Sequence, residues 1–277
     1  MFSWKAGNDN GGPTEGRPYK SVIGINVISM FEIETKNLTK NFGGLVAVNN
    51  LNLQITKGTI FGFLGPNGAG KSTTVKMLTG LLQPTAGESF ISGVSILSSP
   101  HEVKKNIGVL PEDLALFDSL TIWEHLMMCG PIYGLTRSET ELRADQLLKY
   151  LDLRQSRNVY VDQASSGMRK KCSLAMALIH NPAVLFLDEP FEGIDPVSSR
   201  NIKDLLLLLA GRGATIFLTS HILEVVERLV QSFAIIVDGE IVCSKTVEET
   251  LRDGQTIEDL FLQHVRRDEV EQLEWIG

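Results

Sequence analysis

The sequence predicts an α/β fold in which helices wrap a mainly parallel sheet, with an antiparallel β subdomain and a helical subdomain attached. Three patterns predict this fold. Between residues 183 and 237, apolar segments alternate with segments of helical periodicity, which is typical of a parallel sheet. Residues 59–64 are a continuous apolar run, as expected of a strand buried on both faces. Several earlier segments alternate apolar and polar side chains, which indicates strands with one solvated face.

The composition argues against several classes of protein. Of the 277 residues, 43% are hydrophobic and 21% are charged, which suits a globular protein with an ample core. The 26 Lys and Arg against 33 Asp and Glu give a net charge of -7, which disfavours nucleic-acid binding because that depends on basic side chains. No uncharged stretch reaches the ~20 apolar residues of a membrane-spanning helix. The three cysteines have neither zinc-ligand nor disulfide spacing, so we expect a cytoplasmic chain.

The elements follow in order along the chain. Residues 1–29 are expected to be a disordered leader, because residues 6–16 hold too few apolar groups to offset the entropy of ordering them. Alternation from residue 30 onward predicts a strand. The runs 45–55 and 87–94 predict an antiparallel sheet.

The helices are predicted from a 3.6-residue apolar period. The first spans residues 71–82 and ends before Pro84. The remaining predicted helices are centred on 122–132 and 144–151, or span 165–180, 196–210, 222–229 and 256–275. Strands are expected at 183–187, 215–219 and 233–237.

Residues 65–72, GPNGAGKS, match the P-loop pattern G-x-x-x-x-G-K-[ST]. The motif lies between the buried strand at 59–64 and the helix that starts at Lys71. Its glycines let backbone N–H groups surround a phosphate, and the helix N-terminus adds its positive dipole end. Lys71 would reach the β- and γ-phosphates, and the Ser72 hydroxyl would bind Mg²⁺. The alternative is an ordinary glycine-rich turn.

A P-loop needs a carboxylate beside its metal. The apolar run 184–187 ends in Asp188, whose side chain would emerge at the carboxyl edge of the sheet, and Glu189 follows. Asp188 would support the metal. Glu189 would polarise a water for attack on the γ-phosphate. Two solvated acids at a strand end are the alternative.

Five segments together resemble the ATPase subunit of an ABC transporter. They are GPNGAGKST at 65–73, SSGM at 165–168, LFLDEP at 185–190, GIDP at 193–196 and TSH at 219–221, in that order. The resemblance covers about residues 30–265. It implies a P-loop NTPase core with its β subdomain at 30–112 and 166–277, and a helical lobe at 113–165.

The resemblance also implies roles for single residues. Those expected to bind ATP are Phe42, Gly65, Pro66, Asn67, Gly68, Ala69, Gly70, Lys71, Ser72, Thr73, Ser165 and Gly167, the last two from the opposite subunit. Ser72, Asp188 and Glu112 would hold Mg²⁺, and Lys71, Glu189 and His221 would be catalytic. Asp195 matches the loop that crosses the dimer interface. Plain structural roles stay open for Phe42 as a core aromatic and for Ser165 and His221 near helix starts.

Two departures from the family pattern stand out. The signature segment reads Ala164-Ser165-Ser166-Gly167-Met168 where the common form is LSGGQ, and Glu112 replaces the usual Gln. Both resemble the branch of drug, antibiotic and polysaccharide exporters. The basic residues at 169–171 are interpreted as the exposed first turn of the next helix.

The resemblance implies an ATPase that powers export through a separate transmembrane permease, at the inner face of the cell membrane. Two ATPase subunits, in a homodimer or heterodimer, would bind ATP head to tail, and the permease would dock on the helical lobe. A regulatory ABC module, in which ATP-driven dimerisation rather than turnover is the function, remains an alternative. A third possibility, an ABC protein acting on nucleic acid, is disfavoured by the net charge of -7.

Overall fold

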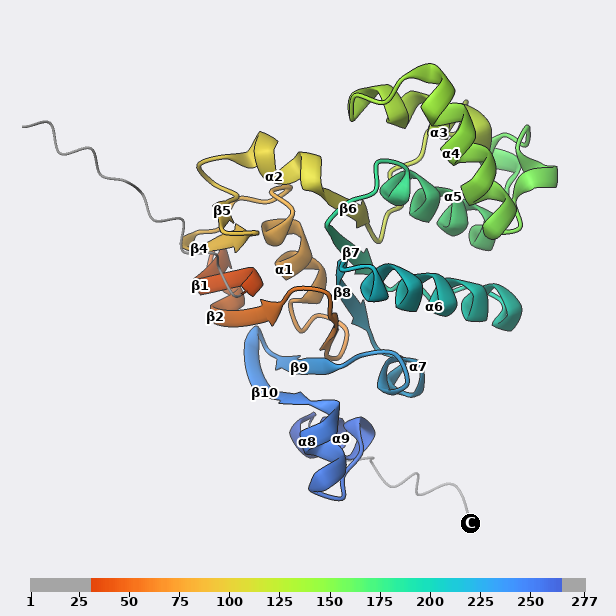
Figure 1. The fold of residues 1–277 in the computed structure, drawn as a ribbon. Coiled ribbons are helices and arrows are strands. Elements are labelled where there is room, and N and C mark those ends of the chain that lie inside the picture. The colour runs from red at the N-terminus through yellow and green to blue at the C-terminus, as the bar shows by residue number, and fades with distance from the viewer. Residues whose placement is uncertain (1–30, 266–277) are drawn as a thin grey trace, which may run out of the picture.

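The computed structural model describes residues 31–265, which form two β-sheets and a set of surrounding helices. The predicted leader at 1–29 lies outside the described residues, as do residues 266–275 of the predicted terminal helix. Figure 1 shows one cluster of helices at one end of the molecule and α8 and α9 at the opposite end, with the larger sheet between them.

The larger sheet has the strand order β10-β9-β3-β8-β7-β6. Its strands are β3 (Ile60–Leu64), β6 (Ile107–Leu110), β7 (Val184–Asp188), β8 (Thr215–Ser220), β9 (Ser232–Val237) and β10 (Glu240–Thr246). All neighbouring pairs are parallel except β10 with β9. Every residue of β3, β7 and β8 is buried, which confirms the prediction of a strand covered on both faces at 59–64.

The smaller sheet is antiparallel, in the order β2-β1-β4-β5. It contains β1 (Phe31–Phe42), β2 (Leu45–Thr56), β4 (Ala86–Ile91) and β5 (Val94–Ser95). Its inward side chains join one apolar core with Phe63 and Phe217 of the larger sheet, whose ring centroids lie 5.3 Å apart. The α/β fold with an antiparallel β subdomain is therefore confirmed.

Helix α1 (Lys71–Leu78) packs into the core between the two sheets through Val75, Met77 and Leu78. It ends earlier than the predicted residue 82. Gly80 adopts the left-handed conformation with φ 66°, and the N–H groups of the two leucines that follow both return to the Lys76 carbonyl. These contacts are typical of a helix terminated by a left-handed glycine.

Three helices form a cluster with its own apolar contacts: α3 (Ile122–Ile132), α4 (Arg137–Tyr150) and α5 (Ser166–Leu178). The first two begin with a capping box, in which a threonine and a glutamate satisfy each other's backbone N–H groups. Leu126, Leu148 and Leu174 belong to the buried core beneath them. Two 3₁₀ turns, Arg154–Ser156 and Val161–Gln163, connect α4 to α5.

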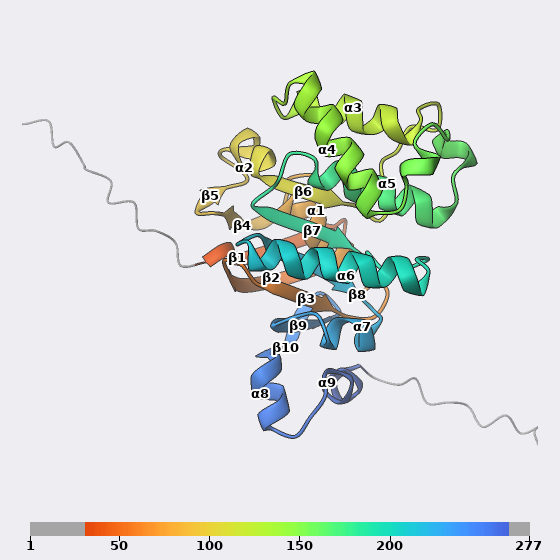
Figure 2. The same ribbon diagram turned by 45° about the vertical axis from the view of Figure 1, so that its right-hand side comes forward.

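The remaining helices are α2 (Pro100–Asn106), α6 (Pro196–Gly211), α7 (Leu223–Glu227), α8 (Val247–Arg252) and α9 (Ile257–His264). Figure 2 shows α6 lying along the large sheet beside β7 and β8. The patterns in the sequence did not predict α2, β6, β10 or α8 as separate elements. Within residues 31–265, no helix combines the length and the apolar character needed to cross a membrane.

Candidate functional site

The P-loop joins the end of β3 to the start of α1, and two of its glycines are required by close backbone contacts. Gly70 has φ 106°, and an added Cβ would lie 2.4 Å from the Ala47 carbonyl oxygen. A Cβ on Gly65 would lie 2.3 Å from the Ile236 carbonyl oxygen. No side chain fits at either position, so the loop backbone packs directly against the strands beside it.

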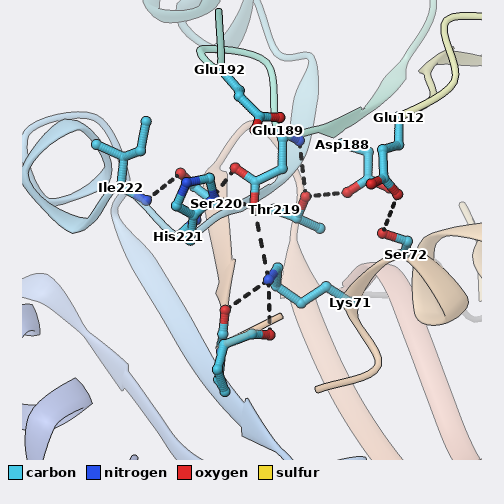
Figure 3. A network of polar contacts seen from close by, with 12 residues as sticks. Lys71, Ser72, Glu112, Asp188, Glu189, Glu192, Thr219, Ser220, His221 and Ile222 are labelled. Carbon is cyan, nitrogen blue, oxygen red and sulfur yellow. Dashed lines mark hydrogen bonds and ion pairs between the residues drawn. The ribbon is translucent and has the colours of Figure 1, made fainter. Parts of the chain in front are cut away.

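Lys71 is the first residue of α1, and its side chain turns back into the loop. It is 7% exposed, and its Nζ donates hydrogen bonds to the carbonyls of Gly65 at 2.7 Å and Pro66 at 3.2 Å. The same Nζ lies 3.8 Å from Glu189 Oε1 (Figure 3). Burial lowers the pKa of Lys71, while the neighbouring Glu189, Asp188 and Glu112 carboxylates favour its charged form. A partly desolvated ammonium of this kind interacts strongly with phosphate oxygens.

Asp188 lies at the carboxyl end of β7 and is 3% exposed. Its Oδ1 accepts a hydrogen bond from the Thr219 hydroxyl at the end of β8. Burial raises the pKa of Asp188, and the hydrogen bond from Thr219 is the largest effect that opposes that shift. The Ser72 hydroxyl donates to Glu112 Oε2 at 3.2 Å. Hydroxyl and carboxylate oxygens from four separate segments therefore meet at this edge of the sheet, as Figure 3 shows.

Glu189 follows Asp188 and directs its carboxylate toward His221. Oε1 lies 3.0 Å from His221 Nδ1, and Oε2 accepts a hydrogen bond from the His221 backbone N–H at 3.4 Å. The Glu189 backbone adopts the left-handed conformation, with φ 48°, and its N–H donates to Thr219 Oγ1 at 3.1 Å. Lys71 and His221 thus approach the same carboxylate oxygen, one from the P-loop and the other from the loop after β8.

One cavity collects most of the residues expected from the sequence. It is lined by Ala47, Asn67, Gly68, Gly70, Lys71, Ser72, Thr73, Glu112, Glu189, Glu192 and His221. Asp188 and Thr219 hydrogen-bond to each other beneath this set. The cavity combines a cation, a carboxylate pair and a helix start, which is the arrangement that binds and hydrolyses a nucleoside triphosphate.

Six of the twelve expected ATP contacts are not among the residues that line this cavity: Gly65, Pro66 and Ala69 within the P-loop itself, and Phe42, Ser165 and Gly167 outside it. Phe42 ends β1 and is 47% exposed, with Lys40 Nζ 5.1 Å from its ring centroid. It is therefore not a core aromatic. Ser165 caps α5 by accepting the Met168 N–H at 3.2 Å, and Gly167 lies in the first turn of that helix. Asp195 likewise caps α6 through the N–H groups of the residues at 197 and 198.

The oxygen donors of Ser72, Glu112 and Asp188 suit a hard cation such as Mg²⁺. In the part of the chain that the structure describes, no group of three or more His, Cys, Asp and Glu side chains is placed to hold a metal by itself. A cation at this edge would therefore complete its ligands with phosphate oxygens and water, as is usual for Mg²⁺ in nucleotide sites.

The structure gives contacts at the site to residues for which the sequence analysis assigned no role. Thr219 contacts both Asp188 and the Glu189 backbone, and Glu192 lines the cavity. The expectation that residues 169–171 form an exposed turn is wrong for all three, and Arg169 is half-buried. Lys171 is 8% exposed, and Lys170 is half-buried against the turn after β7. The sequence carries no local signal for the contacts of Lys170 and Lys171, because each joins α5 to a segment distant along the chain.

Residues 48–192 match the protein family described as ABC transporter. The linearmycin resistance ATP-binding protein LnrL of Bacillus subtilis is 37% identical over 214 residues, which cover 77% of this chain and 69% of that protein. The bacitracin transport ATP-binding protein BcrA of Bacillus licheniformis is 37% identical over 210 residues, covering 76% and 68%.

Solved structures agree with these relatives. An ATP-binding subunit of an ABC transporter superposes with a TM-score of 0.78 at 29% identity, over 83% of this chain and 98% of that one. A dimeric post-hydrolysis state of the ATP-binding cassette MJ0796, bound to ADP and Pi, superposes with a TM-score of 0.73 at 25% identity, over 78% and 98%. With the P-loop, Glu189 and His221 gathered in one cavity and Asp188 beneath it, the chain belongs to the ABC transporter family as an ATP-hydrolysing subunit.

Proposed function

We propose that this chain hydrolyses Mg·ATP to power the export of antibiotic-like compounds through a separate membrane permease. The observation that carries the proposal is the contact of Glu189 with both Lys71 and His221 inside the P-loop cavity. The names of the two relatives above, one a resistance protein and one a bacitracin transport protein, support the class of cargo and the outward direction.

Each side chain in or beside the cavity has a definite chemical task. The loop amides and the Lys71 ammonium bind the β- and γ-phosphates, and Phe42 stacks on the adenine. Glu189 accepts a proton from the attacking water, while His221 orients the Glu189 carboxylate and contacts the γ-phosphate. Ser72, Asp188 and Glu112 would hold Mg²⁺, which would neutralise phosphate charge. The bound Mg²⁺ would also screen the negative charge of Glu112 from the phosphates.

We further propose that the site is completed by a second ATPase subunit. Ser165 and Gly167 lie outside the cavity of their own chain, so they are available to the γ-phosphate held by the other subunit. Because Ser165 caps α5, the free N–H groups of that helix start point toward the same ligand. ATP would join two subunits head to tail, and loss of the γ-phosphate would release them. The dimeric cassette MJ0796 supports this arrangement.

The permease is proposed to dock on the helical lobe, residues 113–165, where that lobe meets the core at 30–112 and 166–277. An apolar pocket lies between them, and among its lining residues are Leu81, Val109, Leu114, Tyr133 and Met176. Leu81 is 62% exposed, and Ile132, which precedes Tyr133 in the chain, is 70% exposed. Exposed apolar side chains of this kind are typical of a protein–protein contact. Such a partner would place the chain at the inner face of the cell membrane.

A regulatory ABC module is the second candidate, favoured by the altered signature at Ser166 and Met168 and by Glu112. In that case ATP-driven dimerisation would be the output and turnover would be secondary. The 3.0 Å contact between Glu189 and His221 argues against it, because a module without turnover has no need of an oriented base.

The two candidates differ in steady-state ATPase activity. We would purify the full chain with the membrane protein that co-purifies with it and measure phosphate release for wild type, Glu189→Gln and Glu224→Gln. Glu224 is an exposed glutamate of α7 and serves as the charge-matched control. Wild type and the control should turn over, and Glu189→Gln should lose at least about 100-fold in kcat. An inactive wild-type complex that still dimerises with ATP would favour the regulatory module.

A further inference from the structure

Lys170 connects the start of α5 to the turn that carries Glu189. Its Nζ donates hydrogen bonds to the backbone carbonyls of Glu189 at 2.8 Å and Glu192 at 2.7 Å. These two residues bound the turn after β7, which is closed by the Glu192 N–H donating to the Glu189 carbonyl at 3.3 Å. One ammonium therefore binds both ends of the turn.

The turn needs such support because of the Glu189 backbone. A left-handed φ of 48° is unfavourable for a residue with a side chain, and it persists only where neighbouring groups hold it. The Glu189 N–H is held by Thr219 Oγ1 at 3.1 Å, and its carbonyl is held by Lys170. Both peptide groups that flank the Glu189 side chain are thus fixed, and its carboxylate is directed toward His221.

Lys170 differs in this respect from the two basic residues beside it. Lys171 Nζ lies 3.4 Å from Ser198 Oγ on α6. The Arg169 side chain makes no hydrogen bond or ion pair with any residue between 31 and 265, and its backbone N–H donates to the Ser165 carbonyl within the first turn of α5. Burial lowers the pKa of Lys170, whereas the carboxylates of Glu192, Glu189, Asp188 and Glu112 favour its charged form. The four carboxylates and the two carbonyl acceptors favour the protonated ammonium that both hydrogen bonds require, against the cost of burying it.

We propose that Lys170 is a positioning residue for ATP hydrolysis, which holds the Glu189 backbone in the conformation that directs the Glu189 carboxylate into the phosphate cavity. The inference rests on the proposed function, in which Glu189 is the base. It also links two sites. Lys170 belongs to the same helix turn as Gly167. A Cβ added to Gly167 would lie 3.6 Å from the Gly193 carbonyl oxygen, so this helix turn lies close to the loop that follows Glu192. Engagement of Ser165 and Gly167 by the other subunit's nucleotide would therefore act on Glu189 through Lys170.

The test compares Lys170→Met, Lys170→Arg and the charge-matched control Arg169→Met in the full chain with its membrane partner. Lys170→Met keeps the length of the side chain and removes its donors. It should lower kcat by about 10- to 100-fold, as expected of a base displaced by up to about 1 Å, with KM for ATP changed less than about twofold. Lys170→Arg retains charge and donors, so it should recover most of kcat. Arg169→Met should match wild type.

A double-mutant comparison separates positioning from general stability. In a Glu189→Gln background, Lys170→Met should cause no further loss of the residual rate, because the group that it positions is already gone. Any of three results would overturn the inference. They are a wild-type kcat in Lys170→Met, a rise in KM for ATP as large as the fall in kcat, and a full further loss of rate when Lys170→Met is added to Glu189→Gln. If Glu189→Gln itself retains wild-type activity, the proposed role of Glu189 fails instead.

Discussion

Thr219→Val is the most informative single change in the site. Thr219 is fully buried, and its hydroxyl both donates to Asp188 Oδ1 and accepts the Glu189 N–H at 3.1 Å. Valine has nearly the same shape but neither hydrogen-bonding function. The substitution therefore removes two contacts without opening a cavity.

The cost can be worked from those two contacts. Losing a hydrogen bond to a charged acceptor costs ~2 kcal/mol, and leaving a half-buried N–H without a partner costs ~1 kcal/mol. We expect Thr219→Val to lower the free energy of unfolding by about 3 kcal/mol, which corresponds to a fall in Tm of about 6–12 °C. Thr219→Ser keeps the hydroxyl and loses one methyl group, so it should cost only about 1 kcal/mol.

Urea unfolding of the nucleotide-free chain, followed by tryptophan fluorescence and circular dichroism, measures both variants. The expected difference between the valine and serine variants is about 2 kcal/mol. Equal stability of the two variants would refute the reasoning, because it would mean that the hydroxyl contributes nothing. A parallel ATPase measurement should show a lower kcat for the valine variant only.

Two further predictions concern the same cavity. Burial raises the pKa of Asp188 above its value in the unfolded chain. The protonated carboxyl therefore contributes stability that is present below the unfolded pKa and is lost as pH rises through the folded pKa, where the buried group becomes charged. Asp188→Asn should therefore raise the Tm of the nucleotide-free chain by a few degrees near pH 8, with a smaller gain toward pH 4, as followed by scanning fluorimetry; a gain independent of pH would contradict this cause. Gly70→Ala should destabilise the chain by more than about 3 kcal/mol and abolish ATP binding, since it combines a left-handed φ with a backbone clash. Gly68→Ala, at φ 81° with open space around it, should cost only about 1–2 kcal/mol, and equal costs measured by urea unfolding would exclude the clash.

Much of the fold and site was readable from local patterns. A continuous apolar run followed by GPNGAGKS predicted β3, the loop and α1, because a P-loop is one contiguous segment. The run that ends in Asp188 placed two carboxylates at a strand end for the same reason. Short or polar elements were not predicted. β6 has only four residues, and the side chains of β10 are exposed or half-buried along its whole length, so neither carries a strong apolar signal.

The sequence alone indicated the family, the α/β fold class and the P-loop, because each motif that carries them is a short contiguous segment. Only the tertiary structure decided which side chains of the site meet. Thr219 reaches Asp188, and Glu112 reaches Ser72, because the order β3-β8-β7-β6 brings the carboxyl ends of parallel strands to one edge. Lys170 contacts the Glu189 turn because α5 begins beside that edge. Strand order and helix placement follow from packing of the whole core, which no local pattern records.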